Sequence, residues 1–458
     1  MMKLSIFAIK WLKSFMIKRM LKNEFVKNVL TLMAGTGFAQ IIPLLAAPFI
    51  TRLFTPAEIG VFAFYFSIVI IVGNVAAGRY ETSIAIAKTD EDALNLVALS
   101  IALSFLVSVI SFIVLFMIHW NYSLFDGAIS EYWAFAIPLL IWIFSSYKSL
   151  SYLAIRNKKF RSISLSSIFE SSFRAGTSIL FGFMSFGSVG LILGGMFGKT
   201  SSLLVLLKST KKYLRSFKDE VNFSKMALLA RRFNKFPKFD LPATLFHTVG
   251  DQGAVILIIK LFSEKTAGLF SYTERILITP VSVFSSSFAQ VFLQKISQKY
   301  HEDELGFKHL VSATFNRFVW YSILPFAVFT YSSKFLVPII FGPNWVELYK
   351  YIWVLSPYIF LVMANAPLGE VLYIISKQEK LLVLKVVFLV LRFSALIIAY
   401  FLDFTPLMSI FLFSIASVIS YEINIFIVLQ TLKNKQWLTL AFLNLVIISA
   451  FVLLYNIL

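Results

Sequence analysis

The sequence has no cysteine, which excludes disulfide bridges, thiolate nucleophiles and cysteine-bound metals. Its four histidines are scattered, and the closest two, His301 and His309, have a spacing that fits no familiar metal motif. Charged residues are also scarce at 14%, whereas hydrophobic residues make up 59% of the 458 positions. This composition lies far outside that of soluble globular proteins, so we expect a membrane protein without a metal site.

Motifs of enzyme active sites are missing as well. There is no glycine-rich phosphate loop, no nucleophile elbow and no HExxH pair, and no polar segment is long enough for a soluble catalytic domain. Asp90 and Asp92 have the spacing of a glycosyltransferase metal site, but in the short turn TDEDA capping of the following helix is the better interpretation. We therefore expect a transporter with no cofactor, and we leave coupling to a proton or sodium gradient open.

Long hydrophobic runs dominate what is present. A helix needs about 20 apolar residues to cross the hydrocarbon core of a bilayer. Dividing the chain at charges, prolines and glycines predicts an all-α integral membrane protein with thirteen candidate spans. They lie near 29–51, 58–88, 94–118, 132–154, 162–184, 188–208, 242–262, 267–293, 310–333, 346–375, 381–402, 406–431 and 437–457.

The longest polar connection, 209–240, divides the first twelve spans into two sets of six. An even number of spans lets both halves enter the membrane from the same side, as parallel repeats related by a pseudo-two-fold axis do. The predicted organisation is a basic amphipathic segment at 1–27 (unless Met16 or Met20 is the true start), a six-helix bundle at 28–208, a basic cytoplasmic linker at 209–240, a second six-helix bundle at 241–431 and an extra transmembrane helix at 432–458.

The distribution of the basic residues behind the formal charge of +19 indicates how the chain is oriented in the membrane. With a cytoplasmic N-terminus, most lysines and arginines fall in inside segments, whereas the predicted outer loops hold only Arg52, Lys265 and Lys334. This asymmetry follows the positive-inside rule. The basic excess is therefore explained by a membrane, and we expect no nucleic-acid partner.

Ionisable residues inside the spans are the candidates for function, because each costs about 2.5–3.5 kcal/mol at the bilayer centre. Bases outnumber acids among these residues, which predicts a cationic interior. The ionisable residues inside the spans are Lys148, Glu170, Arg174, Lys199, Asp251, Lys260, Glu274, Arg275, Arg317, Lys350, Glu370, Arg392 and Glu422, with Arg79 and Glu81 at the inner end of the second span.

Two pairs of these residues have a local geometry that sequence alone defines. Glu170 and Arg174 are four residues apart, so they share one helix face, either as an ion pair that stabilises helix packing or as part of a cavity lining. Glu274 and Arg275 are adjacent and diverge by about 100°, so we expect only one of them to look into a cavity.

Asp251 is predicted to have no neighbour in sequence that can neutralise it. Either a base from another helix pairs with it, or it takes up a proton or a cation. Lys148, Lys199, Lys260 and Lys350 lie nearer span ends, where we expect their ammonium groups to reach the interface.

The sequence resembles the polysaccharide-biosynthesis oligosaccharide flippases. These are the flippases of O-antigen and capsule repeat units, and they belong to the multidrug/oligosaccharidyl-lipid/polysaccharide exporter superfamily. The resemblance covers about 25–431 and is carried by NVLTLMAGTGFAQIIPLLAAPFITRLFTPAEIGVFAFY, GRYETSIAIAKTDEDALNL, AIRNKKFRSISLSSI and GLFSYTERILITPVSVFSSSFAQVF. It implies a MATE-like pair of six-helix bundles around a cationic cavity in a bacterial cell membrane. Arg79 and Arg275 stand where basic residues of this superfamily line that cavity.

The resemblance implies outward movement of an undecaprenyl-diphosphate-linked oligosaccharide for O-antigen, capsule or exopolysaccharide assembly, with membrane lipids and the polymerase and chain-length proteins of the pathway as partners. We assign Arg79, Arg174, Arg275 and Arg317 to the anionic head group, and Glu81, Glu170 and Asp251 to charge balance or coupling. A MATE-type drug or cation exporter is the alternative, followed by a membrane-embedded polymerase or glycosyltransferase.

Overall fold

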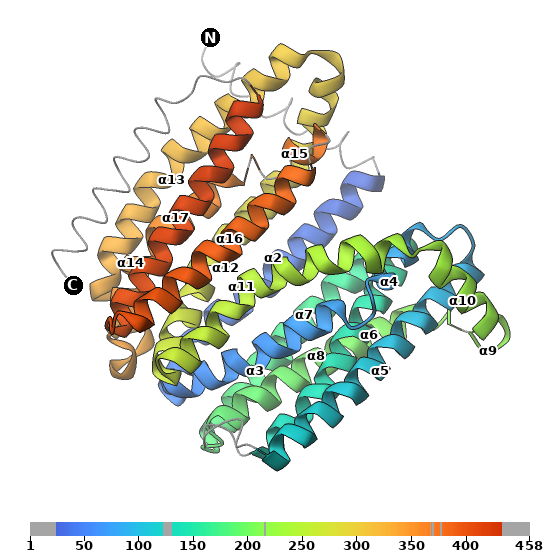
Figure 1. Cartoon of the computed structure of the whole chain (residues 1–458), viewed down its shortest axis with the longest axis horizontal. Coiled ribbons are helices and arrows are strands. Elements are labelled where there is room, and N and C mark those ends of the chain that lie inside the picture. Colours follow the sequence, from blue (N-terminus) through green and yellow to red (C-terminus); the bar gives the residue numbers. More distant parts are fainter. Residues whose placement is uncertain are drawn as a thin grey trace, which may run out of the picture.

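The computed structural model of the chain describes residues 24–432, apart from 122–130, 215–216, 367, 369–370 and 376–377. Across these residues the regular structure is helical throughout (Figure 1), which confirms the predicted all-α class. The thirteenth predicted span and most of the predicted N-terminal segment lie outside the described residues.

The N-terminal half consists of six long helices with short helical turns between them. In chain order these are α2 (Glu24–Leu53), α3 (Pro56–Val75), α4 (Tyr80–Ser83), η1 (Ile84–Ile86), α5 (Asp90–Asn121), η2 (Glu131–Ala136), α6 (Ile137–Arg156), α7 (Phe160–Phe183) and α8 (Ser188–Thr210). Glycines on α8 let α7 approach closely, because a Cβ at Gly194 would lie 2.0 Å from Ser178 Oγ.

The C-terminal half repeats the pattern of six long helices. They and their short turns are α11 (Leu241–Leu261), α12 (Glu264–Glu302), α13 (Glu304–Phe341), η4 (Pro343–Trp345), α14 (Leu348–Asn365), α15 (Val371–Ile374), α16 (Gln378–Phe401) and α17 (Pro406–Thr431). Nine described helical segments are long and apolar enough to cross a membrane. Of the twelve long helices described, α7, α12 and α14 fall below that measure, and α7 and α12 carry charged residues within their apolar stretches.

The connection between the halves contains α9 (Phe217–Glu220), α10 (Phe223–Arg232) and the π-helical turn η3 (Phe236–Asp240). Figure 1 shows α10 lying across the end of α5. Lys225 there pairs with Glu91 at 2.5 Å, and Arg232 pairs with Asp92 at 3.7 Å. The hydrogen bond to Glu91 raises the pKa of Lys225.

The acidic turn before α5 caps that helix, as predicted. The hydroxyl of Thr89 accepts a hydrogen bond from the backbone N–H of Asp92 at 3.0 Å. The carboxylates of Asp90 and Asp92 then pair with Arg156 and with bases of α10, so their roles in this structure are capping and docking of the linker.

Two predicted spans are longer than the helices found. The second was predicted to run to residue 88, but α3 ends at Val75 and a turn follows in which Gly78 and Arg79 have φ of 63° and 64°. Glycine adopts this left-handed conformation without a Cβ clash, so the chain turns although its hydropathy stays high. The tenth was predicted to reach residue 375, but α14 ends at Asn365, two residues before a proline.

The two halves meet at one end and diverge at the other (Figure 1). At the closed end, α3 and α12 touch through glycine: a Cβ at Gly60 would lie 2.0 Å from the carbonyl oxygen of Glu264. Nearby, Trp345 Nε1 donates to the carbonyl of Phe54 at 3.1 Å, and Arg52 donates to two carbonyls at the end of α13 at 3.0 Å.

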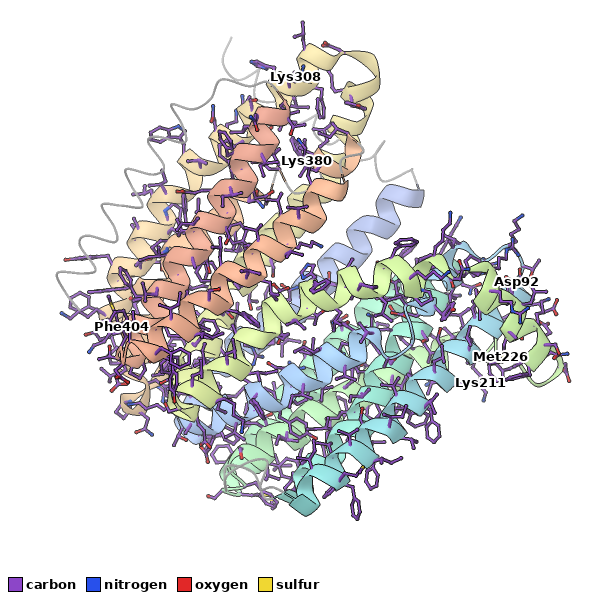
Figure 2. All side chains as sticks on the ribbon, viewed as in Figure 1. Asp92, Lys211, Met226, Lys308, Lys380 and Phe404 are labelled. Carbon is purple, nitrogen blue, oxygen red and sulfur yellow. The ribbon has the colours of Figure 1, made fainter. Side chains whose placement is uncertain are left out.

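The diverging ends carry the basic connections. Figure 2 places Asp92 and Lys211 at the free end of the N-terminal half and Lys308 and Lys380 at that of the C-terminal half. Phe404, in a predicted outer loop, lies toward the end where the halves meet. The labelled residues of the predicted inner segments and the labelled residue of the predicted outer loop therefore lie at opposite ends of the molecule.

Candidate functional site

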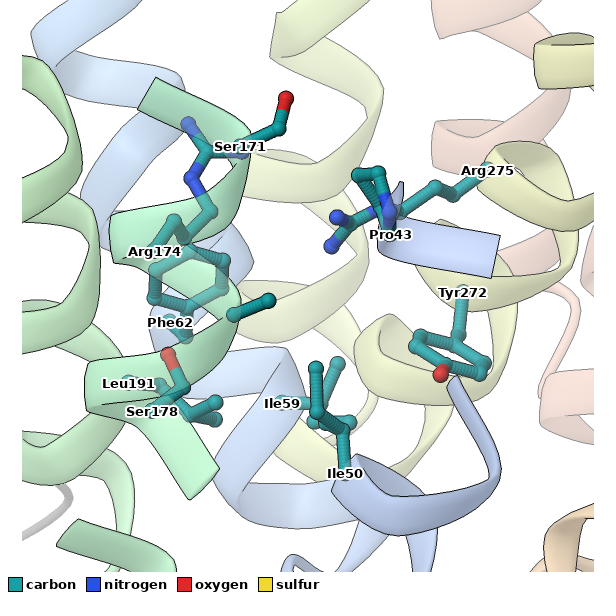
Figure 3. Close-up of a pocket in the computed structure, with 11 residues that line it drawn as sticks. Pro43, Ile50, Ile59, Phe62, Ser171, Arg174, Ser178, Leu191, Tyr272 and Arg275 are labelled. Carbon is teal, nitrogen blue, oxygen red and sulfur yellow. The ribbon is translucent and has the colours of Figure 1, made fainter. Parts of the chain in front are cut away.

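A small pocket lies between the two halves and receives an arginine from each. Arg174 comes from α7 and Arg275 from α12, on opposite sides of the space that Figure 3 shows. Its volume is about 20 Å³ in this conformation. We call it the Arg275 pocket; it is lined by Pro43, Ile50, Ile59, Phe62, Ser171, Arg174, Ala175, Ser178, Leu191, Tyr272 and Arg275.

The charges around this pocket do not cancel. Glu170 lies 3.5 Å from Arg174 and 2.8 Å from Lys199, so one carboxylate serves two bases. The charged neighbour of Arg275 is Arg174, and among the residues that the structure describes no carboxylate pairs with it. Three bases and one acid give the Arg275 pocket and its rim a formal charge of +2.

The Arg174 guanidinium has unused hydrogen-bonding capacity as well as charge. Its Nε is buried and has no hydrogen-bond partner. A buried donor without an acceptor is costly, and an anionic ligand would satisfy it. Lys199, by contrast, has two partners: its ammonium group pairs with Glu170 and lies over the ring of Tyr147, 4.4 Å from the ring centre. The expectation that Lys199 reaches the interface is wrong, because Glu170 holds it inside.

Glu274 and Arg275 diverge as the sequence predicted. Glu274 accepts a hydrogen bond from the Tyr358 hydroxyl inside the C-terminal half. Arg392 lies 5.2 Å from the ring centre of Tyr358 and donates to Ser417 at 2.8 Å. Glu274 therefore belongs to the core of its own half, whereas Arg275 faces the pocket between the halves.

A second set of charges lies near the inner end of α3, and we call it the Arg79 cluster: Arg79, Glu81, Lys148 and Asp240. Arg79 contacts Glu81 at 3.1 Å and Asp240 at 2.8 Å, and Lys148 lies 3.5 Å from Glu81. Glu81 is 1% exposed. Two bases and two acids cancel here, and the pair with Asp240 ties the N-terminal half to the start of α11.

Arg79 and Arg275 were expected to line one cavity, and the structure separates them. Two nitrogens of Arg79 are occupied by carboxylates, whereas Arg275 faces another arginine. Arg317 was grouped with them too, but it lies exposed on α13 and does not line the Arg275 pocket. Lys148 was expected to reach the interface, but Glu81 and the Asn74 side chain at 3.0 Å hold it inside.

Asp251 has a partner that sequence analysis missed. His247, one helical turn earlier on α11, places its Nδ1 2.9 Å from Asp251 Oδ2. The expectation that no sequence neighbour neutralises Asp251 is therefore wrong, and the i,i+4 spacing was the available signal. Both side chains are about half exposed, and Lys385 of α16 lines the same cavities.

Solved structures of membrane transporters share this fold. The lipid II flippase MurJ in an inward closed conformation matches with a TM-score of 0.67 and 16% identity, over 93% of this chain and 97% of that one. A multidrug resistance MATE family transporter matches in its inward-facing conformation with a TM-score of 0.64 and 15% identity, over 86% and 94% of the two chains. An outward-facing structure of a multidrug resistance MATE family transporter matches with a TM-score of 0.57 and 15% identity, over 89% of this chain and 96% of that one.

No curated protein sequence matches this chain significantly. A family model described as polysaccharide biosynthesis protein matches residues 49–350, a stretch that includes Arg79, Arg174 and Arg275. This match and the shared fold confirm the resemblance and the MATE-like architecture, in which the helices form a multi-pass membrane protein. The chain belongs to this family of polysaccharide biosynthesis proteins.

Proposed function

We propose that this chain is a flippase that moves an undecaprenyl-diphosphate-linked oligosaccharide from the cytoplasmic to the outer leaflet by alternating access. The observation that carries the proposal is the Arg275 pocket, where each half contributes an arginine and the local charge is positive. Family membership supports a role in polysaccharide assembly, and the fold is one that transporters use.

A diphosphate suits this pocket chemically. Guanidinium forks bind phosphate oxygens in pairs, and a diphosphate can satisfy donors of Arg174 and Arg275 at once. The pocket must widen from about 20 Å³ to admit it, so binding requires the halves or their side chains to move. The lipid tail stays in the bilayer, and only the head group needs a polar path.

Topology and energy agree with outward transport. With the N-terminus in the cytoplasm of a bacterial cell, the diverging ends of the two halves face inward. A membrane potential is worth about 2.3 kcal/mol per charge per 100 mV, so an interior-negative membrane favours outward movement of a diphosphate. Glu81 and Glu170 balance neighbouring bases in this scheme, and the His247–Asp251 pair is the candidate for coupling to a proton or sodium gradient.

The decisive test is transfer of a fluorescent undecaprenyl-diphosphate oligosaccharide in proteoliposomes that contain the purified full chain. We expect transfer to be faster than in protein-free liposomes, and a cationic dye on the same vesicles to be unaffected. Transport of the dye without transfer of the lipid would replace the flippase by a MATE-type exporter.

A further inference from the structure

Two neighbouring cavities, which together we call the polar hollow, lie apart from the Arg275 pocket and share no lining residue with it. The first has a volume of about 360 Å³ between α3, α11 and α16, and the second about 320 Å³ between α11, α14, α16 and α17. They share His247, Asp251 and Lys385. Each volume falls in the range of about 300–1,000 Å³ that is usual for sites of small molecules.

Uncharged hydrogen-bonding groups and aromatic rings dominate the lining of the polar hollow. Amides and hydroxyls each offer both donors and acceptors, as sugar hydroxyls do, and aromatic rings offer flat apolar faces. The groups are Asn74, Thr244, Thr248 and Gln252 in the first cavity, and Phe246, Asn365, Phe388, Ser420, Tyr421 and Asn424 in the second.

One acceptor in the second cavity lacks a donor. Asn424 donates from Nδ2 to Asn365 Oδ1 at 3.1 Å, but Asn424 Oδ1 is buried and has no hydrogen-bond partner. Buried polar atoms are almost always paired, so this oxygen marks a position where a ligand hydroxyl would donate.

Each base of the polar hollow has an acid beside it, unlike Arg275 in its pocket. Asp251 pairs with His247, and both Asp251 and Asp240 are electrostatic neighbours of Lys385. An anion such as a diphosphate gains little in such a place, whereas a neutral polyhydroxylated ligand can replace its hydrogen bonds to water by hydrogen bonds to the lining.

The two sites lie at different depths on the same helix. Phe62 of α3 lines the Arg275 pocket and Asn74 lines the polar hollow. Twelve residues of α-helix rise about 18 Å, so a ligand that reaches both sites must be extended. A diphosphate followed by several sugar units has that shape.

We infer that the polar hollow is the saccharide subsite, which holds neutral sugar units through amide, hydroxyl and aromatic groups while the diphosphate occupies the Arg275 pocket. This inference rests on the proposed flippase function. It assigns recognition of the sugar to α11, α14, α16 and α17 of the C-terminal half, with Asn74 contributed by α3.

The test is competition binding to the full chain in lipid nanodiscs, with fluorescent undecaprenyl diphosphate as the reporter. The two competitors are unlabelled undecaprenyl diphosphate and the lipid-linked oligosaccharide fraction extracted from cells that make this chain. We expect the parent to bind the sugar-bearing fraction at least about tenfold more tightly. Asn424→Ala and Gln252→Ala should each weaken that binding by about 3- to 10-fold and keep the affinity for undecaprenyl diphosphate.

Asn157→Ala, which removes an asparagine from the turn after α6, is the matched control and should change neither affinity. Binding of undecaprenyl diphosphate also reports that each variant is folded. Equal affinity of the parent for both competitors, or equal weakening of both by Asn424→Ala and Gln252→Ala, would overturn the saccharide subsite and leave the flippase standing. A parent that binds neither lipid would instead overturn the proposed function itself.

Discussion

The Arg79 cluster and the Arg275 pocket contain similar residues and differ in what surrounds them. In the Arg79 cluster two bases meet two acids, one of which is 1% exposed. At the Arg275 pocket Arg174 and Lys199 share a single carboxylate, and Arg275 faces Arg174 with no carboxylate of its own among the described residues. A base inside a membrane protein can therefore attract an anionic substrate only where neighbouring acids do not already neutralise it.

The largest expected effect is the loss of stability on breaking the Arg79 cluster. Glu81→Gln leaves Lys148 without its carboxylate in a buried place, which typically costs about 3–5 kcal/mol. Thermal unfolding in detergent or nanodiscs measures this loss. Glu347→Gln is the control, because its partner Lys265 and the carboxylate are both about half exposed. The pair Glu81→Gln with Lys148→Gln should recover much of the stability, and an unchanged melting temperature of Glu81→Gln would contradict the cluster's structural role.

The next effect separates the two sites by transport. Arg275→Gln should lower the transfer of undecaprenyl-diphosphate oligosaccharide by about 10- to 100-fold, because a charge-assisted hydrogen bond to phosphate is worth about 1.5–3 kcal/mol. Arg275→Lys should be intermediate, since it keeps the charge and loses the fork. The neutral pair Glu81→Gln with Lys148→Gln, which removes one base and one acid of the Arg79 cluster together, should stay within about threefold of the parent, as should the exposed Lys334→Gln. Loss of transfer in the paired variant together with normal transfer by Arg275→Gln would contradict the distinction between the Arg79 cluster and the Arg275 pocket.

A smaller effect concerns the closed end next to the Arg275 pocket. A Cβ at Gly60 would lie 2.0 Å from a carbonyl oxygen of α12, so Gly60→Ala should disfavour this closure by about 1–3 kcal/mol. The chain has no cysteine, so a Ser178→Cys reporter in the pocket is unique. We expect a membrane-impermeant thiol reagent applied from outside to label the reporter faster with Gly60→Ala. Gly176→Ala, which meets nothing within 4 Å, should leave labelling as in the parent.

The smallest effect is expected where acids and bases pair in water. Arg232→Gln removes a pair with Asp92 at the linker, where the Arg232 side chain is 41% exposed. Surface pairs contribute little and are screened by salt, so the melting temperature should fall by about 1–2 °C at low salt and not at high salt. A loss as large as that of Glu81→Gln would show that burial does not set the difference between these pairs.

Much of the fold could be predicted from the sequence because apolar runs of membrane length are long-range signals that few other structures produce. The ends of helices were harder. Hydropathy continues through Gly78, so the turn at Arg79 was read as part of a span, and α12 and α13 extend beyond their apolar cores as far as Glu302 and Glu304.

The candidate site could be predicted only where partners are close in sequence. Spacing gave Glu170 with Arg174, and it could have given His247 with Asp251. The pairing of Lys199 with Glu170 joins two helices, and that of Arg79 with Asp240 joins the two halves. Contacts between helices leave no periodic pattern in the sequence. The sequence therefore shows how many bases lie inside the spans, but not which of them are neutralised by an acid on another helix.

In the proposed mechanism Arg174 and Arg275 together hold the diphosphate. The most direct measurement is an experimental structure of the full chain in nanodiscs with undecaprenyl diphosphate bound. We predict density for the diphosphate between these two arginines, with the Arg79–Asp240 pair intact. A diphosphate bound to Arg79 with that pair broken, and none at the Arg275 pocket, would contradict the claim.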